Sequence, residues 1–345
     1  ATSYKQLLKI ANEQCEEMIF SVQCIKQYGY SNTRNITYGN RCTAGSMWNN
    51  YLPNPHFVES FETATGEKFN WDNYLPGYSA MKEKERVVFF LRDGLSAAEK
   101  ERMTAYGADM SKYLDSGNEA RIKKAYESRD PRLQMAVITP YAQYNGASSG
   151  IAHTYTLRWP YRGSDSAEPF DIRTDTNDKF YYLWRKFVPE GLEQTERDTY
   201  GLDIPLIRYA EVLLLKAEAL NEWGSTHESE AIRCVNEVRR RAGHVELNNA
   251  TYPATKVNGQ SDLRERIRNE YYWEIGGEDS MYFHELRWGT WKDKKFDNNR
   301  NGLMQMWGET TYTWYWLGDQ CWSWPIPAKE MEMNSNLEQN EGWIN

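Results

Sequence analysis

Three stretches of the sequence place large aromatic rings next to amide or guanidinium groups. A pyranose ring has an apolar C–H face and polar edges, so a protein can hold it with a flat ring on that face and hydrogen-bonding groups alongside. The residues with this combination are Trp48, Asn49 and Tyr51 in "SMWNNYLPN", Trp71 and Tyr74 in "NWDNYLPG", and Arg158, Trp159 and Tyr161 in "LRWPYRG". The alternative for each ring is an anchor that fixes its own loop, and no motif distinguishes the two.

The sequence contains no recognisable catalytic or metal-binding motif. It has no Gly-x-Ser-x-Gly nucleophile turn and no Walker loop, and its five histidines lack the spacing of zinc ligands. Carboxylate pairs are common in a chain with 49 Asp and Glu residues, and a glycosidase pair is defined by its separation in space. The "GGED" run at 276–279 is typical of a turn between helices. We therefore expect no catalytic residues, no metal ligands and no cofactor.

Charge and composition exclude some kinds of partner. The 345 residues include 41 Lys and Arg against 49 Asp and Glu, a formal charge of -8, and the basic residues form no long block. Nucleic acids require clustered positive charge, so we expect none as a partner. No stretch approaches the roughly 18 apolar residues of a membrane-spanning helix. The five cysteines are too few for a disulfide framework, and their pairing stays open.

Five tryptophans crowd into residues 307–324, "WGETTYTWYWLGDQCWSW". Aromatic residues make up 14% of the chain while its mean hydropathy is -0.82, so we expect many rings near a polar surface. Burial of one such side chain stabilises a fold by about 1.5–3 kcal/mol, which is reason enough for a packed structural segment. We expect these rings to fill space within the fold, with a ligand surface as the alternative.

The elements that must position these residues are helices and a few strands, separated by long irregular stretches. Residues 27–76 and 141–178 are irregular and show no sustained period, and long ordered loops are often functional. Residues 18–25, "MIFSVQCI", and 132–141, "RLQMAVITPY", have the composition of strands. The sequence therefore predicts that the aromatic stretches lie on loops carried by a more regular frame.

The strongest helical signal comes from two neighbouring segments. Residues 205–224, "PLIRYAEVLLLKAEALNEWG", carry an apolar stripe at helical spacing, with proline in the first turn and glycine at the end. Residues 229–243, "SEAIRCVNEVRRRAG", predict a second helix whose last turn holds three arginines, where cations favour the helix dipole. The two helices have the size of a tetratricopeptide pair. A third helix is expected in "LRERIRNEYYWEI", capped by Ser261 or Asp262.

Six short patterns along the chain resemble those of the SusD/RagB family of bacterial outer-membrane nutrient-binding lipoproteins. They are "EEMIFSVQC", "RDPRLQMAV", "RYAE", "VRRRAG", "NEYYWEIGGEDSMYFHELRWG" and "WPIPAKEMEMNSNLEQNEGW". Each is degenerate alone, but six in the family's order over residues 17–343 are specific. Tyr271 and Met281 stand where the family usually has arginine, and His284 replaces an aspartate, which indicates a divergent branch.

The resemblance implies a mainly α fold, with tetratricopeptide-like helical pairs in an α-superhelical body, long irregular loops and a few short strands. We expect one SusD/RagB-like domain over residues 1–345. Residues 1–200 would form its loop-rich ligand-facing part, and 201–345 its helical core and C-terminal tail. Family members begin with a lipidated cysteine and further tetratricopeptide-like helices, and we expect this chain to lack that front segment.

The resemblance also implies a function. Family members are surface-exposed outer-membrane lipoproteins that bind a glycan without cleaving it and deliver it to a SusC-like TonB-dependent transporter. Membrane attachment is through an N-terminal lipid anchor that we expect to be absent from this chain. Ligand-contacting aromatics in the family tend to come from loops on one face, which carries over to the three stretches above by segment only.

Two alternatives to glycan capture stay open. One is a tetratricopeptide module that binds a peptide in a helix-lined groove, and the other is an α-helical glycoside hydrolase. The identity of the glycan, the involvement of calcium, the contribution of the expected front segment and the oligomeric state are also open.

Overall fold

The computed structural model describes residues 3–44, 46–148, 150–162, 167–174, 179–193, 197–296 and 302–344. The chain divides into two compact units: unit 1 is Ala1–Glu278 with Met304–Glu309, and unit 2 is Asp279–Leu303 with Thr310–Asn345. Helices dominate and strands are short, which confirms the expected mainly helical fold class. The expected single domain with a change of character at residue 200 stays a prediction. Within the described ranges, no helix is long and apolar enough to cross a bilayer.

Unit 1 holds the elements that carry the candidate site. Its α-helices are α1 (Tyr4–Leu7), α2 (Arg34–Tyr38), α3 (Pro55–Ser60), α4 (Glu83–Arg86), α5 (Ala97–Tyr106), α6 (Asn118–Glu127), α7 (Pro131–Ala136), α8 (Tyr209–Trp223), α9 (Glu228–Ala242) and α10 (Gln260–Ile275). Its strands form antiparallel pairs: β1 (Met18–Val22) with β6 (Ile204–Arg208), β2 (Val137–Ile138) with β5 (Leu183–Trp184), and β3 (Gln143–Ser148) with β4 (Ile151–Thr156).

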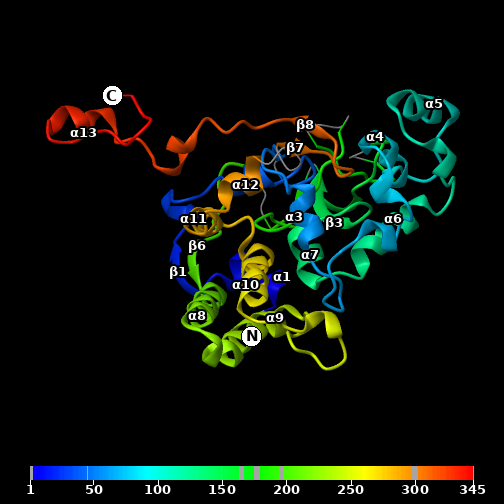
Figure 1. Ribbon diagram of the computed structural model, residues 1–345. Helices are drawn as coiled ribbons and strands as arrows, with labels where there is room; N and C mark the ends of the chain where they lie inside the picture. Colours follow the sequence, from blue (N-terminus) through cyan, green and yellow to red (C-terminus); the bar gives the residue numbers. More distant parts are fainter. Residues whose placement is uncertain are drawn as a thin grey trace. The chain divides into compact units, whose positions relative to one another are not determined.

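Helices α8, α9 and α10 pack together as the helical body of unit 1 (Figure 1). The buried side of α8 is lined at helical spacing by Ala210, Leu214 and Ala217. Helix α9 ends before Gly243, whose φ of 77° lets the backbone turn out of the helix. The α8–α9 pair is the predicted tetratricopeptide-like hairpin.

Two predicted helix starts were wrong. Helix α8 begins at Tyr209 rather than at Pro205, because the intervening residues pair with β1 as strand β6. A proline is tolerated in this two-stranded sheet because one side of the strand needs no donor. Helix α10 begins at Gln260, so neither Ser261 nor Asp262 caps it.

The strand expected at 132–141 is mostly helix α7, and only its two-residue β2 is extended. The side chain of Asp130 accepts a hydrogen bond from the backbone N–H of Arg132 at 2.9 Å, and Pro131 occupies the first helical position. Both features favour a helix start, and here they prevail over the strand-like composition.

A buried ion-pair network joins α7, α9 and α10 to the β1–β6 sheet. The participating cations are Arg132, Lys186, Arg208, Arg239 and Arg241, and the carboxylates are Glu17, Glu62, Asp130, Glu270, Glu274 and Glu278. Arg208 is a central member: its guanidinium lies 2.7 Å from Glu17, 2.9 Å from Glu274 and 2.8 Å from Glu278. Since strand β6, the residue before β1 and the three helices contribute charges, the network fixes their mutual positions.

The arginines at the end of α9, predicted to favour the helix dipole, differ in burial, and Arg239 forms buried ion pairs instead. Its side chain is 0% exposed and contacts Glu62 at 2.9 Å and Glu270 at 3.0 Å. Arg240 is the solvated member, and it pairs with Glu246 at the surface.

Unit 2 and the adjoining segments contain the remaining elements, namely α11 (Ser280–Arg287), α12 (Trp291–Phe296), β7 (Leu303–Met304), β8 (Thr310–Tyr312) and α13 (Ala328–Met333). In unit 2 the ring of Trp316 lies 5.3 Å from Phe296, 5.5 Å from Trp291 and 5.4 Å from Trp322, centroid to centroid. These rings form a small aromatic core, as expected for a structural segment.

The other tryptophans of the 307–324 stretch differ in burial. Trp307 belongs to unit 1 and is 0% exposed, with its ring 5.1 Å from that of Trp159. Trp314 and Trp324 are 40% and 72% exposed. The space-filling role predicted for this stretch therefore holds for three of its five tryptophans and does not describe the other two.

Candidate functional site

The loop of residues 46–51 is held against α2 by main-chain hydrogen bonds. The backbone N–H of Trp48 donates to the carbonyl of Ile36 at 2.9 Å, and that of Tyr51 donates to the carbonyl of Thr37 at 3.0 Å. These bonds satisfy the loop backbone and fix the positions from which its side chains leave the protein.

Gly39 allows the loop and the helix to approach this closely. A Cβ atom at Gly39 would lie 2.6 Å from the carbonyl oxygen of Asn35 and 2.8 Å from Cγ of Met47, so a larger residue would force them apart. Two residues of the loop have left-handed backbone, Ser46 with φ 58° and Asn49 with φ 43°. Strained backbone of this kind persists only where the surrounding contacts hold it in place, and it is common at functional sites.

Both aromatic rings of the loop face solvent. Trp48 is 42% exposed and Tyr51 is 60% exposed, and Asn50 between them is also exposed. Asn49, predicted as a hydrogen-bond partner of a ligand, is only 4% exposed. The left-handed turn at this residue places its side chain inside the protein, so its amide is not available at the surface.

The ring of Tyr51 rests on other aromatic residues. It lies 5.8 Å from the ring of Tyr38, which in turn meets Trp184 edge to face at 5.6 Å. The hydroxyl of Tyr38 donates to the carbonyl of Gly277 at 3.0 Å, which ties this ring to the end of α10. Tyr51 is therefore an exposed ring on a fixed base.

Arg197 completes the surface around Trp48. Its guanidinium carbon lies 4.5 Å from the centroid of the Trp48 ring, and its carbonyl accepts a hydrogen bond from the Asn35 side chain at 3.2 Å. The guanidinium covers one face of the ring, so a sugar would stack on the opposite face, with the N–H donors of Arg197 close by. Arg197 was missed from the sequence because its partner ring is distant along the chain.

The second predicted stretch contributes one accessible ring. Trp71 is 7% exposed: its Nε1 donates to Glu59 at 2.7 Å and its ring stacks on Tyr78 at 4.7 Å. It therefore anchors its loop and cannot stack on a sugar. Tyr74 is half-buried and stacks on Phe69 at 5.7 Å.

Tyr74 also lines an open groove of about 330 Å³. The groove has apolar walls from Phe89 and Leu114, and Arg121 stacks its guanidinium 4.7 Å from the ring of Phe89. This hollow is large enough for one sugar residue.

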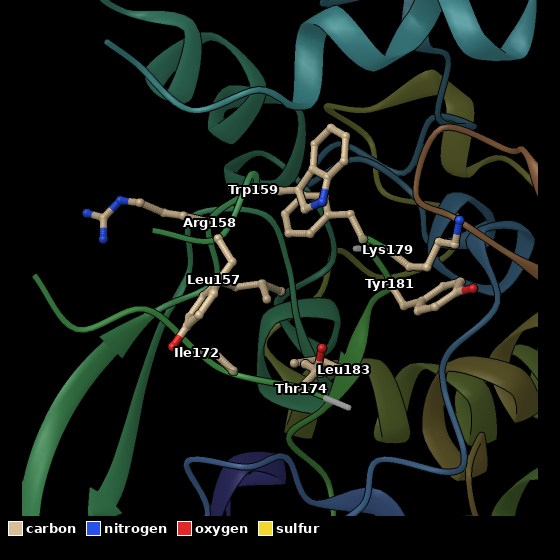
Figure 2. A pocket seen from close by; sticks show the side chains of 10 residues that line it. Leu157, Arg158, Trp159, Ile172, Thr174, Lys179, Tyr181 and Leu183 are labelled. Carbon is tan, nitrogen blue, oxygen red and sulfur yellow. The ribbon is translucent and has the colours of Figure 1, made fainter. Parts of the chain in front are cut away.

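In the third predicted stretch the tryptophan is also buried. Trp159 is 6% exposed, and its ring lies 6.1 Å from Phe180 and 5.1 Å from Trp307. The cavity beside it has a volume of about 10 Å³, room for about one water molecule (Figure 2). Trp159 therefore has no face for a sugar ring, which corrects the prediction from its loop-like sequence.

The polar neighbours of Trp159 are engaged in the protein. Figure 2 shows the guanidinium of Arg158 pointing away from Trp159. It contacts Asp171 at 3.0 Å and Glu119 at 3.5 Å, and Asp171 also pairs with Arg162 at 2.8 Å. Tyr161 is half-buried. Of the eight predicted site residues, the structure exposes Trp48 and Tyr51 on one loop, places Tyr74 in a separate groove and buries Asn49, Trp71 and Trp159.

A larger hollow, of about 600 Å³, lies between α8 and α9. Its floor is apolar, with Ala210, Leu213 and Val238, and charged side chains surround it. Several of these already have partners: Glu17 and Arg241 belong to the buried network, and Arg240 pairs with Glu246. The groove thus has the helix-lined form expected of a peptide site and few rings for a sugar. In the described part of the chain, no three His, Cys, Asp or Glu side chains are arranged to hold a metal ion.

Comparison of the chain with known proteins identifies its family. Residues 16–343 match the model of the SusD family. The chain belongs to the SusD family. It is 32% identical over 139 residues to a "SusD-like protein" of Formosa agariphila, and 28% identical over 161 residues to "Starch-binding protein SusD" of Bacteroides thetaiotaomicron. These segments cover 40% and 46% of this chain but 24% and 25% of those proteins.

Solved structures of SusD-like proteins share the fold. A SusD-like protein from Bacteroides fragilis superposes on 99% of this chain with a TM-score of 0.62 at 20% identity. A SusD-like carbohydrate binding protein from the same species superposes on 97% with a TM-score of 0.58 at 22% identity. In both cases this SusD-family chain spans 57% of the length of the solved protein.

Proposed function

We propose that this SusD-family protein binds a glycan at the cell surface through the loop of residues 46–51 and does not cleave it. The observation that carries the proposal is the pair of exposed rings, Trp48 and Tyr51, on a loop fixed to α2, with Arg197 stacked on one ring. Two exposed rings on one short loop can contact neighbouring sugars of one polymer. The names of the relatives from Bacteroides agree with a carbohydrate ligand.

The expected affinity is modest. A ring stacked on an aromatic side chain contributes about 1–3 kcal/mol, by analogy with nucleic-acid bases. Two stacks and a few hydrogen bonds then give dissociation constants from roughly millimolar to micromolar. Such binding holds a sugar chain but also lets it leave, as a carrier requires.

Calorimetric titration of poly- and oligosaccharides into the wild-type protein and into Trp48→Ala and Tyr51→Ala variants tests the site. Each variant should bind about 5- to 150-fold more weakly than wild type, because it loses one stack of about 1–3 kcal/mol. The matched control is Trp223→Ala, because Trp223 is 75% exposed on α8, away from the loop. It should bind like wild type. Equal affinity in all four proteins, or no binding of any glycan, would contradict the proposal.

The absence of cleavage is part of the proposal, and the burial of the carboxylates in the ion-pair network of unit 1 supports it. Glu270 and Glu274 of that network are 0% exposed. A polymer cannot reach an acid pair sealed in this way. Release of reducing ends from any glycan that binds would instead support the glycoside hydrolase alternative.

Delivery of the glycan to a SusC-like TonB-dependent transporter of the outer membrane, with attachment through an N-terminal lipid, is the second part of the proposal. It is supported by membership of the SusD family. A transporter gene immediately upstream of the gene for this chain is the genomic observation that would add to this support.

The second candidate function is peptide binding in the groove between α8 and α9. Its volume of about 600 Å³ and its helix-lined walls favour it. In that case loop rings would be irrelevant, so Trp48→Ala would leave ligand binding unchanged, whereas Leu213→Asp in the groove would abolish it.

A further inference from the structure

The open groove of about 330 Å³ beside Tyr74 combines apolar walls with positive charge. Its apolar part includes Tyr74, Phe89 and Leu114. Among the described residues that line the groove, those that carry charge are Lys112 and Arg121, and both are positive. Cations and apolar surface therefore face the same small hollow.

Arg121, on α6, is held in place by neutral groups. Its guanidinium carbon lies 4.7 Å from the ring centroid of Phe89. Its Nη1 donates to the carbonyl of Lys112 at 3.1 Å, and its Nη2 donates to the side-chain oxygen of Asn118. Asn118 is 0% exposed and donates from its own amide to the carbonyl of Val88 at 2.9 Å. This fixed amide orients the guanidinium at the wall of the groove.

The positive charge of Arg121 has no counter-charge in the protein. Within the described ranges no carboxylate forms an ion pair with it, and its Nε has no hydrogen-bond partner. Burial lowers the pKa of the guanidinium, and no neighbouring carboxylate offsets this. A partly buried charge is costly to leave unpaired. An anion bound in the groove would supply the missing partner.

Lys112 adds a second positive charge that is only weakly compensated. Its Nζ lies 3.9 Å from a carboxylate oxygen of Asp109, and a pair so long and partly exposed contributes little. The other oxygen of Asp109 accepts hydrogen bonds from the backbone and the hydroxyl of Ser111, at 3.3 Å and 2.5 Å. Asp115, the next acid along the chain, pairs with Lys100 at 2.5 Å. Even with Asp109 counted, the cations at the groove outnumber the carboxylate.

Tyr74 supplies a surface for a sugar ring. One face of its ring rests on Phe69, with centroids 5.7 Å apart and planes 29° apart, so the opposite face is the one that a ligand can reach. A pyranose places its C–H face on such a ring. A guanidinium group only donates, and its planar fork matches two oxygens of a carboxylate or a sulfate. The ring and the arginine together are complementary to an acidic sugar.

We propose that the groove beside Tyr74 is a second binding site, which takes an acidic sugar residue with its carboxylate or sulfate ester on Arg121 and its C–H face on Tyr74. Lys112 adds attraction for the same negative charge. The site shares no residue with the loop of residues 46–51, so this proposal goes beyond the proposed function and is tested separately from it. The acidic sugar can be a single residue or one unit of a chain, and the test distinguishes the two.

Calorimetric titration of a protein without the loop rings tests the groove. The parent protein is the Trp48→Ala/Tyr51→Ala double variant, in which any remaining binding occurs elsewhere. The probes are trigalacturonate, its neutral methyl ester, galacturonic acid and a sulfated carrageenan oligosaccharide. At least one acidic probe should bind about tenfold or more tightly than the methyl ester. The preference should shrink as NaCl rises from about 50 mM to about 500 mM, since salt screens exposed charges.

The length of the ligand follows from the same titrations. Equal affinity for galacturonic acid and trigalacturonate identifies a single sugar as the ligand. Tighter binding of trigalacturonate identifies a chain whose other units also contact the protein.

Variants of the groove, made in the same parent, assign the residues. Arg121→Gln should weaken binding of the acidic probe about tenfold or more, the range of a hydrogen bond to a charged group. Tyr74→Ala should weaken it about 5- to 150-fold, whereas Tyr74→Phe keeps the ring and should bind like the parent. Arg240→Gln is the matched control, because Arg240 is an exposed arginine on α9 outside the groove.

A further variant remains informative where Arg121→Gln does not fold. Leu114 is 43% exposed at the groove wall, so Leu114→Glu adds negative charge while every contact of Arg121 stays in place. It should weaken binding of the acidic probe about tenfold or more and leave binding of the methyl ester unchanged. Thermal melting like that of the parent shows that a variant is folded.

Failure of this proposal differs from failure of the proposed function. Absence of binding by every acidic probe, equal binding of the methyl ester, or unchanged binding in both Arg121→Gln and Leu114→Glu overturns the groove site. Acidic binding that Arg240→Gln removes places the charged site near α9 and overturns it as well. None of these results bears on the loop of residues 46–51, which is tested by the loss of glycan binding in the single variants Trp48→Ala and Tyr51→Ala.

Discussion

Replacing Glu274 with alanine should lower the free energy of unfolding by about 3–5 kcal/mol, because it removes a carboxylate shared by three arginines of the buried network. The carboxylate of Glu274 is 0% exposed and contacts Arg208 at 2.9 Å, Arg132 at 3.4 Å and also Arg241. Chemical denaturation followed by tryptophan fluorescence measures the change. A loss of this size is a large fraction of the stability of most domains.

The controls separate burial from charge. Arg240→Ala breaks the exposed pair with Glu246 and should leave the midpoint of denaturation unchanged. Glu274→Gln keeps the side-chain size and removes only the charge, so it stays informative where the alanine variant does not fold. Equal midpoints for Glu274→Gln and wild type would show that the network does not stabilise unit 1.

Acid should unfold the protein through the same network. The pKa values of Glu62, Asp130, Glu274 and Glu278 are lowered in the folded protein: burial alone would raise them, but neighbouring cations outweigh it. A carboxyl group whose pKa is lower when folded stabilises the fold above its unfolded pKa, and this contribution is lost as pH falls towards the folded value. Ordinary unfolded values are about 3.9 for Asp and 4.3 for Glu.

The contribution of these carboxyl groups to the free energy of unfolding should therefore change little between about pH 7 and pH 5. It should fall steeply below about pH 4.5. The slope should reach about 1.4 kcal/mol per pH unit for each carboxyl group that takes part. Denaturation curves at a series of pH values measure it. Glu274→Gln should show a shallower fall than wild type. Parallel curves for the two proteins would contradict the assignment.

The network explains why the fold could be recognised from the sequence. Its charges come from the short patterns that resemble the family: Glu17 from "EEMIF", Arg132 from "RDPRL", Arg208 from "RYAE", Arg239 from "VRRRAG" and Glu274 from the α10 pattern. A buried ion pair requires a basic residue at one position and an acidic residue at the other, so these positions can be recognised in the sequence. The helical spacing of apolar residues in α8 and α9 can be recognised in the same way.

The site could be predicted only in part, for a physical reason. Trp48, Trp71 and Trp159 lie in similar polar, proline-containing stretches, yet they are 42%, 7% and 6% exposed. What covers the buried pair comes from distant or separate segments, such as Phe180 and Trp307 over Trp159. Local sequence indicates that an aromatic residue lies on a loop. It does not indicate whether distant segments of the chain cover the ring.

Helix boundaries illustrate the same rule. The periodic pattern of α8 extends back to Pro205, but pairing with β1 turns that part into a strand. A periodic pattern indicates which faces are apolar, and long-range pairing decides where the regular backbone starts.

The most direct test of glycan capture is a crystal structure of this chain with a bound oligosaccharide from the titration series. We predict a sugar ring whose C–H face lies about 4 Å from the ring of Trp48 or Tyr51, with a sugar oxygen about 3 Å from a nitrogen of Arg197. A ligand seated between α8 and α9 or beside Tyr74, with the loop of residues 46–51 bare, would contradict the account.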